Sequence, residues 1–236
     1  MNATAAIHAT DVAPDRTRDS ARDIAALDID TLVIAGWTGR NAEAVEHHIR
    51  ELEAIGVPRP KRVPLFYRAA AANLSCAPRI EVVGAGSSGE VEFVLVSAPS
   101  GLWVGVGSDH TDRELEKQSV PLSKQVCAKP IAAALWPYAS VAAHWDRLEL
   151  RSWAWIGGER RVYQSGSVSA IRQPADLIRG FCGSEQLPVG TAMFCGTLPV
   201  QAQVEFAGRF EFELADPVLD RVLRHAYDVV ALPVVE

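Results

Sequence analysis

Short apolar runs separated by glycine-containing or polar turns dominate the chain from Arg79 onwards. They are rich in β-branched and aromatic residues, which favour strands, and several alternate apolar with polar positions. The predicted strands are residues 80–83, 91–96, 103–106, 148–156, 161–167, 192–195, 202–206 and 209–214. Gly157-Gly158 is expected to join two of them as a hairpin, whereas residues 222–232 fit either a strand or a helix.

Helical periodicity is confined to two stretches. In residues 41–55, apolar or amphipathic side chains recur every three or four positions and Gly56 follows, as in an amphipathic helix with a glycine stop. Residues 174–182 predict a second helix, and residues 30–35 an early strand. Because strands and helices do not alternate regularly, the pattern excludes a doubly wound sheet. It predicts an α+β fold dominated by β structure.

Length and charge limit the classes of protein open to this chain. Its 236 residues, 48% of them hydrophobic, are enough for one domain with a sizeable core. We predict a flexible N-terminal segment over residues 1–22, without the apolar stretch of a signal peptide, and a single domain over residues 23–236. The net charge is −6 without a dense Lys/Arg block, which argues against a nucleic-acid partner. No apolar run is long enough to span a membrane.

The cysteines carry no metal or redox signature. The chain has four of them, and none forms a C-x-x-C pair. We therefore expect buried, reduced thiols and a cytoplasmic protein. The four residues are Cys76, Cys127, Cys182 and Cys195.

Gly84-x-Gly86-x-x-Gly89 has the spacing of a dinucleotide-binding loop. Such a loop must open a helix, because the pyrophosphate binds at the helix N-terminus. Here residues 90–96 read as a strand, with Val and Phe at strand-forming positions. We therefore predict no nucleotide cofactor, and interpret the glycines as a hairpin turn.

Glu90 and Glu92 share one face of that strand, so their carboxylates are close neighbours. They are either a solvated strand edge or two ligands for a hard cation such as Mg²⁺. Asp109 follows the next strand, and is either part of a polar turn that caps a short helix or a third carboxylate for the same ion. His110 is an alternative ligand beside it.

Other candidate residues lie on the first helix and in later loops. His48 and Glu51 are three positions apart on the predicted helix, so the Glu51 carboxylate can orient the His48 imidazole as a general base. Alternatively, both are ordinary helix residues without a catalytic role. Lys124 and Lys129 are either surface charges or neutralise a substrate carboxylate or a developing enolate. The 196–199 segment, which contains Thr197, is either a turn or a loop of backbone donors.

In this order, over about residues 32–214, the motifs resemble those of the fumarylacetoacetate hydrolase superfamily. The helix with His48-x-x-Glu51 is similar to the family's H-x-x-E, and Glu90-x-Glu92 to its E-x-E metal pair. The remaining similar segments are Gly39-Arg40-Asn41, Pro64 to Arg68, Gly107 to Arg113, Lys129, and Cys195 to Val200. The resemblance implies a mixed β-roll with few helices, and a homodimer.

The resemblance also implies a set of site residues. Glu90, Glu92 and Asp109 would hold Mg²⁺ or Mn²⁺, and His48, Glu51 and Lys129 would be catalytic. Arg113, Thr197 and Arg68 would bind the substrate. The implied activity is a metal-dependent hydrolase or lyase that cleaves a C–C bond of a small 2-oxo acid or acylpyruvate through a metal-bound enolate. Alternatives are a decarboxylase, a hydratase, an isomerase or a non-catalytic small-molecule binding protein.

The chain departs from the family's pattern at several positions. Ser108 stands where the family has Asn, and Glu116 where it has Gln. Lys129 lacks the flanking Gly and Ser, so either Lys124 or Lys129 could be the site lysine. These changes indicate a divergent branch with a different substrate pocket.

Overall fold

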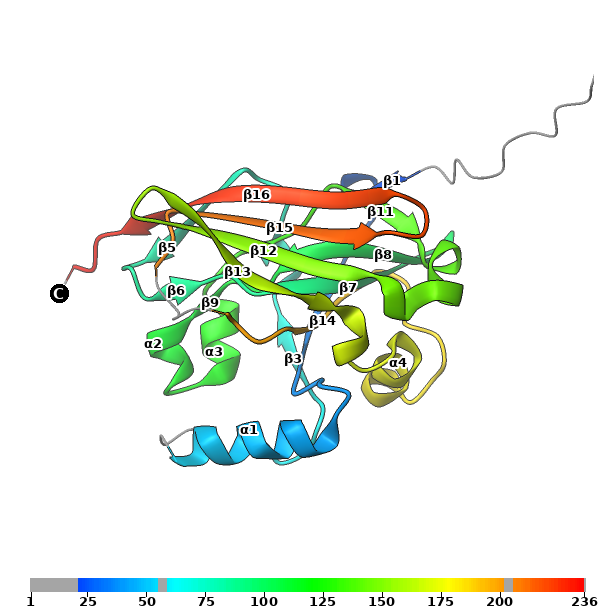
Figure 1. The fold of residues 1–236 in the computed structure, drawn as a ribbon, viewed down its shortest axis with the longest axis horizontal. Coiled ribbons are helices and arrows are strands. Elements are labelled where there is room, and N and C mark those ends of the chain that lie inside the picture. The colour runs from blue at the N-terminus through cyan, green and yellow to red at the C-terminus, as the bar shows by residue number, and fades with distance from the viewer. Residues whose placement is uncertain (1–20, 55–58, 202–205, 236) are drawn as a thin grey trace, which may run out of the picture.

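The fold is built from two large β-sheets that pack against each other (Figure 1). The structure, a computed structural model, describes residues 21–54, 59–201 and 206–235; the side chains of His48, Glu51 and Leu52 also lie outside its description. The N-terminal segment predicted over residues 1–22 lies outside it as well, except for its last two residues.

The larger sheet has seven strands in the order β1-β11-β8-β7-β14-β2-β3. Within it β14 and β2 run parallel and the other neighbours antiparallel, so the sheet is mixed. The strands are β1 (Arg22–Asp23), β11 (Ala134–Pro137), β8 (Gly101–Ser108), β7 (Val91–Ala98), β14 (Thr191–Thr197), β2 (Thr31–Gly36) and β3 (Leu65–Ala69).

The second sheet has five strands in the order β13-β12-β15-β16-β5, with β16 and β5 parallel. These strands are β13 (Glu159–Ser167), β12 (Glu149–Ile156), β15 (Arg209–Asp216), β16 (Arg221–Leu232) and β5 (Arg79–Val83). Two short pairs complete the β structure: β10 (Lys129–Pro130) with β4 (Leu74–Ser75), and β6 (Ser87–Ser88) with β9 (Thr111–Asp112).

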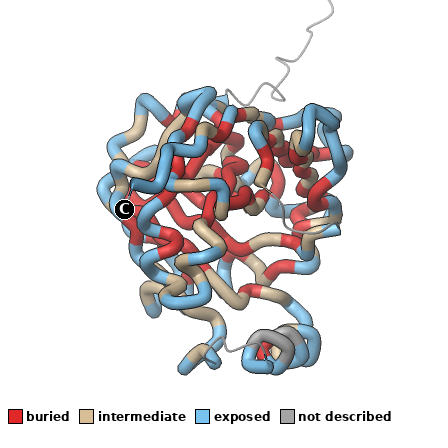
Figure 2. Tube along the Cα trace, turned by 90° about the vertical axis from the view of Figure 1, so that its left-hand side faces the viewer, coloured by how far each residue is buried: buried red, intermediate tan, exposed pale blue. Residues whose placement is uncertain are grey.

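The main core lies between the two large sheets. Phe93 and Leu95 of β7 belong to the same buried cluster as Phe210 and Phe212 of β15. The alternate β7 residues, including Val94, belong to a second cluster on the other face of the seven-stranded sheet. Strand β7 is therefore buried on both faces, which is why its sequence is nearly continuously apolar. Buried residues fill the interior and exposed ones the outer loops (Figure 2).

Helices are few and peripheral. They are α1 (Ala42–Ala54), α2 (Arg113–Glu116), α3 (Val120–Gln125) and α4 (Pro174–Cys182). Five short 3₁₀ turns cover Ile24–Ala26, Ala71–Asn73, Tyr138–Ser140, Ala142–Arg147 and Val168–Ala170. Helices α2 and α3 lie side by side, and α1 lies below them at the bottom of the view (Figure 1). Among the described residues, no helix is long and apolar enough to cross a membrane.

Most predicted elements are confirmed. The hairpin at Gly157-Gly158 is β12–β13, the second helix is α4, and residues 222–232 form most of strand β16. The strand predicted over residues 202–206 lies almost wholly outside the described residues. Cys127 and Cys195 are buried free thiols as expected, whereas Cys76 and Cys182 are partly exposed.

The interpretation of the glycine-rich loop is confirmed in one respect and wrong in another. No helix follows Gly89: strand β7 starts at Val91, so the loop lacks the helix N-terminus that a dinucleotide needs. However, β5 and β7 do not form a hairpin, because β5 pairs with β16 in one sheet and β7 with β8 and β14 in the other. The loop instead carries the chain from one sheet to the other.

Candidate metal centre

Strand pairing brings Glu90 opposite Asp109. In the antiparallel β7–β8 pair, Val91 is opposite Ser108 and Glu92 is opposite Gly107. If this register is extended by one residue, Glu90, which precedes β7, lies opposite Asp109, which follows β8. The Asp109 N–H accordingly donates a 2.9 Å hydrogen bond to the Glu90 carbonyl. The site therefore forms where β7 begins and β8 ends.

Three carboxylates meet at this point. One oxygen from each of Glu90, Glu92 and Asp109 lies within 4.8 Å of the other two. Asp109 and Glu92 are buried, and the Glu90 side chain is 17% exposed. Ligand oxygens lie roughly 2.0–2.6 Å from Mg²⁺ or Ca²⁺, so two oxygens on one ion are separated by at most about 4–5 Å. The three carboxylates are close enough to share one ion.

The chemistry of the cluster also fits a divalent cation. Oδ1 of Asp109 is buried and accepts no hydrogen bond from the described residues, although the Lys129 ammonium lies 3.2 Å away. Burial, and then the charges of Asp109 and Glu90, raise the pKa of Glu92 well above its ordinary value. A divalent cation would ligate this oxygen and offset the repulsion from Asp109 and Glu90, which contributes after burial to the raised pKa of Glu92. The donor set is oxygen only, as Mg²⁺ and Mn²⁺ prefer.

Two lysines contact Asp109. The sequence left open whether Lys124 or Lys129 reaches the site, and in the structure both do. Lys124, on α3, makes an ion pair with Oδ2 of Asp109 and lies 3.8 Å from Oε2 of Glu90. Lys129, on β10, lies 3.2 Å from Oδ1 of Asp109 and donates a 2.6 Å hydrogen bond to the His110 carbonyl. Both lysines are buried, and both are within reach of the carboxylates.

Arg113 bridges two of the acidic residues. One of its terminal nitrogens lies 3.0 Å from Oε1 of Glu90, and the other 2.9 Å from Oε2 of Glu116. Its Nε donates a 2.7 Å hydrogen bond to the Ser88 hydroxyl. Arg113 is the first residue of α2, and the Asp112 side chain caps that helix. The polar segment after β8 is thus both a helix cap and part of the site.

The loop after β14 also contacts the carboxylate cluster. The Gly196 N–H donates a 2.7 Å hydrogen bond to Oε2 of Glu92. The register between β14 and β7 shifts between Phe194 and Thr197, and this irregularity turns the Gly196 amide towards Glu92. Gly196 has φ of +102°, and a Cβ there would lie 1.7 Å from Oγ1 of Thr38. Only glycine fits this position.

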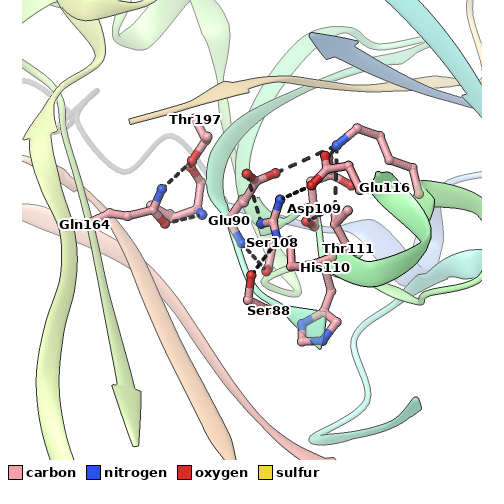
Figure 3. Close-up of polar contacts among 12 residues, drawn as sticks. Ser88, Glu90, Ser108, Asp109, His110, Thr111, Glu116, Gln164 and Thr197 are labelled. Carbon is pink, nitrogen blue, oxygen red and sulfur yellow. Dashed lines mark hydrogen bonds and ion pairs between the residues drawn. The ribbon is translucent and has the colours of Figure 1, made fainter. Parts of the chain in front are cut away.

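Gln164 of β13 ties the two sheets together beside the site. Its Oε1 accepts a 2.9 Å hydrogen bond from the Val91 N–H, and its Nε2 donates to Oγ1 of Thr197 and to the Leu198 carbonyl, both at 2.6 Å (Figure 3). The Thr197 hydroxyl in turn donates to the Val91 carbonyl at 2.8 Å. Gln164 was not among the predicted site residues, because its only signal in the sequence is an amide inside a predicted strand.

His110 faces away from the carboxylates. Its ring nitrogens lie 2.8 Å from the Tyr227 hydroxyl and 2.9 Å from the Ser87 hydroxyl. Burial, with the nearby charges of Lys129 and Arg113, lowers the pKa of His110 to about 3, so the ring is neutral. The alternative of His110 as a metal ligand is therefore wrong, because both nitrogens are engaged. Tyr227, on β16, was not anticipated.

The remaining predicted residues lie elsewhere or cannot be placed. Arg68 is on the exposed side of β3, and its guanidinium lies 3.4 Å from Oγ1 of Thr31. Its neighbour Tyr67 points to the other face of β3, where burial raises the pKa of its phenol and the charges of Lys124, Glu116 and Asp109 have smaller effects on it. The structure therefore brings Tyr67, which the sequence analysis did not select, towards the site. The side chains of His48 and Glu51 lie outside the described part of α1.

Several solved structures have a fold similar to that of this chain. Cg1458, solved with an inhibitor, matches with a TM-score of 0.63 and 14% identity, over 87% of this chain and 78% of that one. 2-Keto-3-deoxy-D-arabinonate dehydratase, complexed with magnesium and 2,5-dioxopentanoate, matches with a TM-score of 0.61 and 17% identity, over 87% and 74%. Yeast ynq8, a fumarylacetoacetate hydrolase family protein, matches with a TM-score of 0.59 and 14% identity, over 86% and 94%.

These similarities establish the fold and confirm the mixed β-roll expected from the motifs. A search of curated proteins found no sequence match. The model of the family described as "Protein of unknown function (DUF2848)" matches residues 35–227, which is most of the chain. The protein therefore belongs to this family, and its fold is similar to that of a fumarylacetoacetate hydrolase family protein.

Proposed function

We propose that the protein is a divalent-metal-dependent hydrolase or lyase that cleaves a C–C bond in a small 2-oxo acid or an acylpyruvate-like substrate. The observation that carries the proposal is the buried cluster of Glu90, Glu92 and Asp109, whose oxygens lie within 4.8 Å of one another. The similar dehydratase was solved with magnesium and 2,5-dioxopentanoate, which is itself a 2-oxo acid. Both points support a metal site that receives a 2-oxo acid.

Mg²⁺ or Mn²⁺ held by Glu90, Glu92 and Asp109 would polarise the 2-oxo carbonyl and lower the cost of negative charge on the adjacent carbon. The basic residues around the cluster would supply the remaining electrostatic stabilisation. Burial lowers the pKa of Lys129, Asp109 opposes this shift, and Lys124 adds to it. We propose that Lys129 stabilises the negative charge that develops on the substrate oxygen.

Substrate binding is assigned to residues around the carboxylates. Arg113 is 20% exposed, and we propose that it neutralises a substrate carboxylate from its place between Glu90 and Glu116. The Thr197 hydroxyl is bonded to the Val91 carbonyl, so a substrate contact from Thr197 would use its backbone. Arg68 could act only on a substrate part that reaches the exposed side of β3.

His48 and Glu51 remain our candidates for the base and its orienting carboxylate. Their spacing on α1 places the two positions on one helix face. In the proposed hydrolysis, the imidazole takes a proton from water, and the hydroxide forms a bond to the acyl carbon. The C–C bond then breaks, and its electron pair stays on the carbon next to the 2-oxo group. That carbon takes up the proton held by the imidazole.

A reaction other than hydrolytic C–C cleavage is the second candidate, because the similar solved structure with magnesium is a dehydratase. Decarboxylation, hydration and isomerisation could use the same carboxylates, since a fold alone does not select the reaction. The homodimer and the cytoplasmic location remain predictions.

A Mg²⁺-supplemented activity screen over acylpyruvates, oxaloacetate and related oxo-acids or lactones tests the proposal. We expect turnover of at least one 2-oxo acid by the wild type, lost on chelation and in the Glu92→Ala variant. Turnover that persists in Glu92→Ala, or that is unaffected by chelation, would contradict the assignment.

A further inference from the structure

Lys124 places its ammonium where two of the proposed metal ligands converge. Its Nζ contacts Oδ2 of Asp109, lies 3.8 Å from Oε2 of Glu90, and lies 3.5 Å from Oγ1 of Thr111. The side chain is 9% exposed, so little water separates it from the carboxylates. An ion that bound these two carboxylates would meet the ammonium there.

The charges around the site show what this lysine does without a metal. Four carboxylates face one another across the site, and three basic side chains lie among them. Although burial opposes its charge, Asp109, Glu90 and Glu116 together hold the pKa of Lys124 above its ordinary value. Lys124 is therefore a resident cation that neutralises part of the cluster. The carboxylates are Glu90, Glu92, Asp109 and Glu116, and the cations are Arg113, Lys124 and Lys129.

We propose that Lys124 is a tethered competitor of the metal, which must leave Asp109 and Glu90 when the ion binds, and that Glu116 receives its ammonium. This inference rests on the proposed metal site and goes beyond it, because it names the residue that sets the affinity of that site. A divalent ion and an ammonium repel each other strongly at contact distance in a poorly solvated site, so they cannot both stay on the same pair of carboxylates, Asp109 and Glu90.

Lys124, and not Lys129, is the lysine that can move. Lys129 is fully buried in β10 and is fixed by a 2.6 Å hydrogen bond to the His110 carbonyl. Lys124 reaches the site from the short helix α3 on a flexible four-carbon side chain, and retains slight exposure. Displacement therefore requires a change in one side chain rather than in the strands.

Glu116 is the acceptor that this displacement needs. It lies on α2, which packs against α3, and its charge attracts Lys124 in the present arrangement. Its Oε2 pairs with Arg113, whereas its Oε1 has no hydrogen bond to the described residues. The resemblance to the fumarylacetoacetate hydrolase motifs predicts glutamine at this position, and a neutral amide could not form an ion pair with the released ammonium. Lys124 and Glu116 thus form a matched pair.

Titration of the metal-free full chain with Mg²⁺ or Mn²⁺, by calorimetry or Mn²⁺ spin resonance, tests the inference. We expect Lys124→Met to bind the ion more tightly than the wild type, by on the order of tenfold, as for typical couplings between sites. Lys117→Met is the matched control: it removes an exposed α2 lysine that pairs with Glu114, and should leave the affinity unchanged.

A double-mutant cycle separates competition from a general charge effect. Glu116→Gln should weaken metal binding when Lys124 is present, and should have little effect in the Lys124→Met background, where no ammonium needs an acceptor. Circular dichroism checks folding, and Lys124→Gln replaces Lys124→Met if the latter is unfolded. Equal affinity in the wild type and the lysine variant would overturn the competition while leaving the metal site intact. Absence of binding in both would overturn the metal site and the inference with it.

Discussion

The Gly196 N–H donates a 2.7 Å hydrogen bond to Oε2 of Glu92, and this contact joins the loop after β14 to the carboxylate cluster. A side chain at Gly196 cannot be accommodated, because a Cβ would lie 1.7 Å from Oγ1 of Thr38 and φ is +102°. Replacing this glycine should therefore disturb both the conformation of the loop and the geometry of the carboxylate cluster.

We expect Gly196→Ala to lower the free energy of unfolding by at least about 2 kcal/mol, from strain and steric conflict together, and to weaken metal binding. Urea unfolding and metal titration measure the two effects. Gly101→Ala is the matched control, since Gly101 has φ of +120° but nothing within 4 Å of its Cβ position. It should cost about 1–2 kcal/mol from backbone strain alone, less than Gly196→Ala, and spare the metal. Equal losses in both variants would show that the contact with Thr38 is unimportant.

Gln164→Leu should destabilise the junction between the two sheets. The change removes the acceptor for the buried Val91 N–H and the donor to the Leu198 carbonyl, and each buried group left unpaired costs roughly 1–3 kcal/mol. We expect a loss of about 2–4 kcal/mol in unfolding free energy, measured by urea denaturation. Gln186→Leu, at an exposed position, should change it by less than about 0.5 kcal/mol. A loss no larger than that of Gln186→Leu would contradict the structural role of Gln164.

Metal binding should release a proton from Glu92. Burial, then Asp109 and Glu90, raise its pKa well above the ordinary value of 4.5, whereas a ligand must be ionised. Calorimetry in two buffers with different heats of ionisation should therefore give different binding heats at a pH between 4.5 and the raised pKa, and identical heats in Glu92→Gln. Affinity should rise with pH through the same interval. Buffer-independent heats in the wild type would refute the raised pKa.

The same shift has a consequence for the metal-free protein. Because the pKa of Glu92 is higher in the folded state, its contribution to stability is fully present below about pH 4.5 and is lost as pH rises through the folded-state pKa. The stability of the wild type relative to Glu92→Gln should thus fall as pH increases above 4.5, measured by thermal unfolding with a chelator. A constant difference across that range would contradict the prediction.

His48→Ala should reduce turnover by roughly 10²–10⁴-fold, the usual contribution of a general base, while leaving metal affinity unchanged. His47→Ala is the control on the same helix, because neighbouring helix positions point about 100° apart. Steady-state kinetics and metal titration on both variants distinguish the roles. Similar losses of activity in the two variants would argue that the helix as a whole, and not His48, matters.

The carboxylates were predictable because the signals that reveal them are local. Glu90 and Glu92 share a strand face by alternation, and Asp109 directly follows the next strand, which pairs with theirs in an antiparallel register. In contrast, Gln164 and Tyr227 reach the site from strands distant in the sequence, and nothing local shows where those strands pair. For the same reason the glycine loop was taken for a hairpin: β5 finds its partner in β16, near the end of the chain.

The most direct test of the metal site compares two proteins, the wild type and a Glu90→Gln/Glu92→Gln double variant. Each is titrated with Mg²⁺ or Mn²⁺, and binding is measured by calorimetry. Glu114→Gln, an exposed glutamate on α2, serves as the control for lost negative charge. We predict a single saturable site per chain in the wild type and in Glu114→Gln, and no binding in the double variant. Undiminished binding in the double variant would contradict the assignment of these carboxylates as metal ligands.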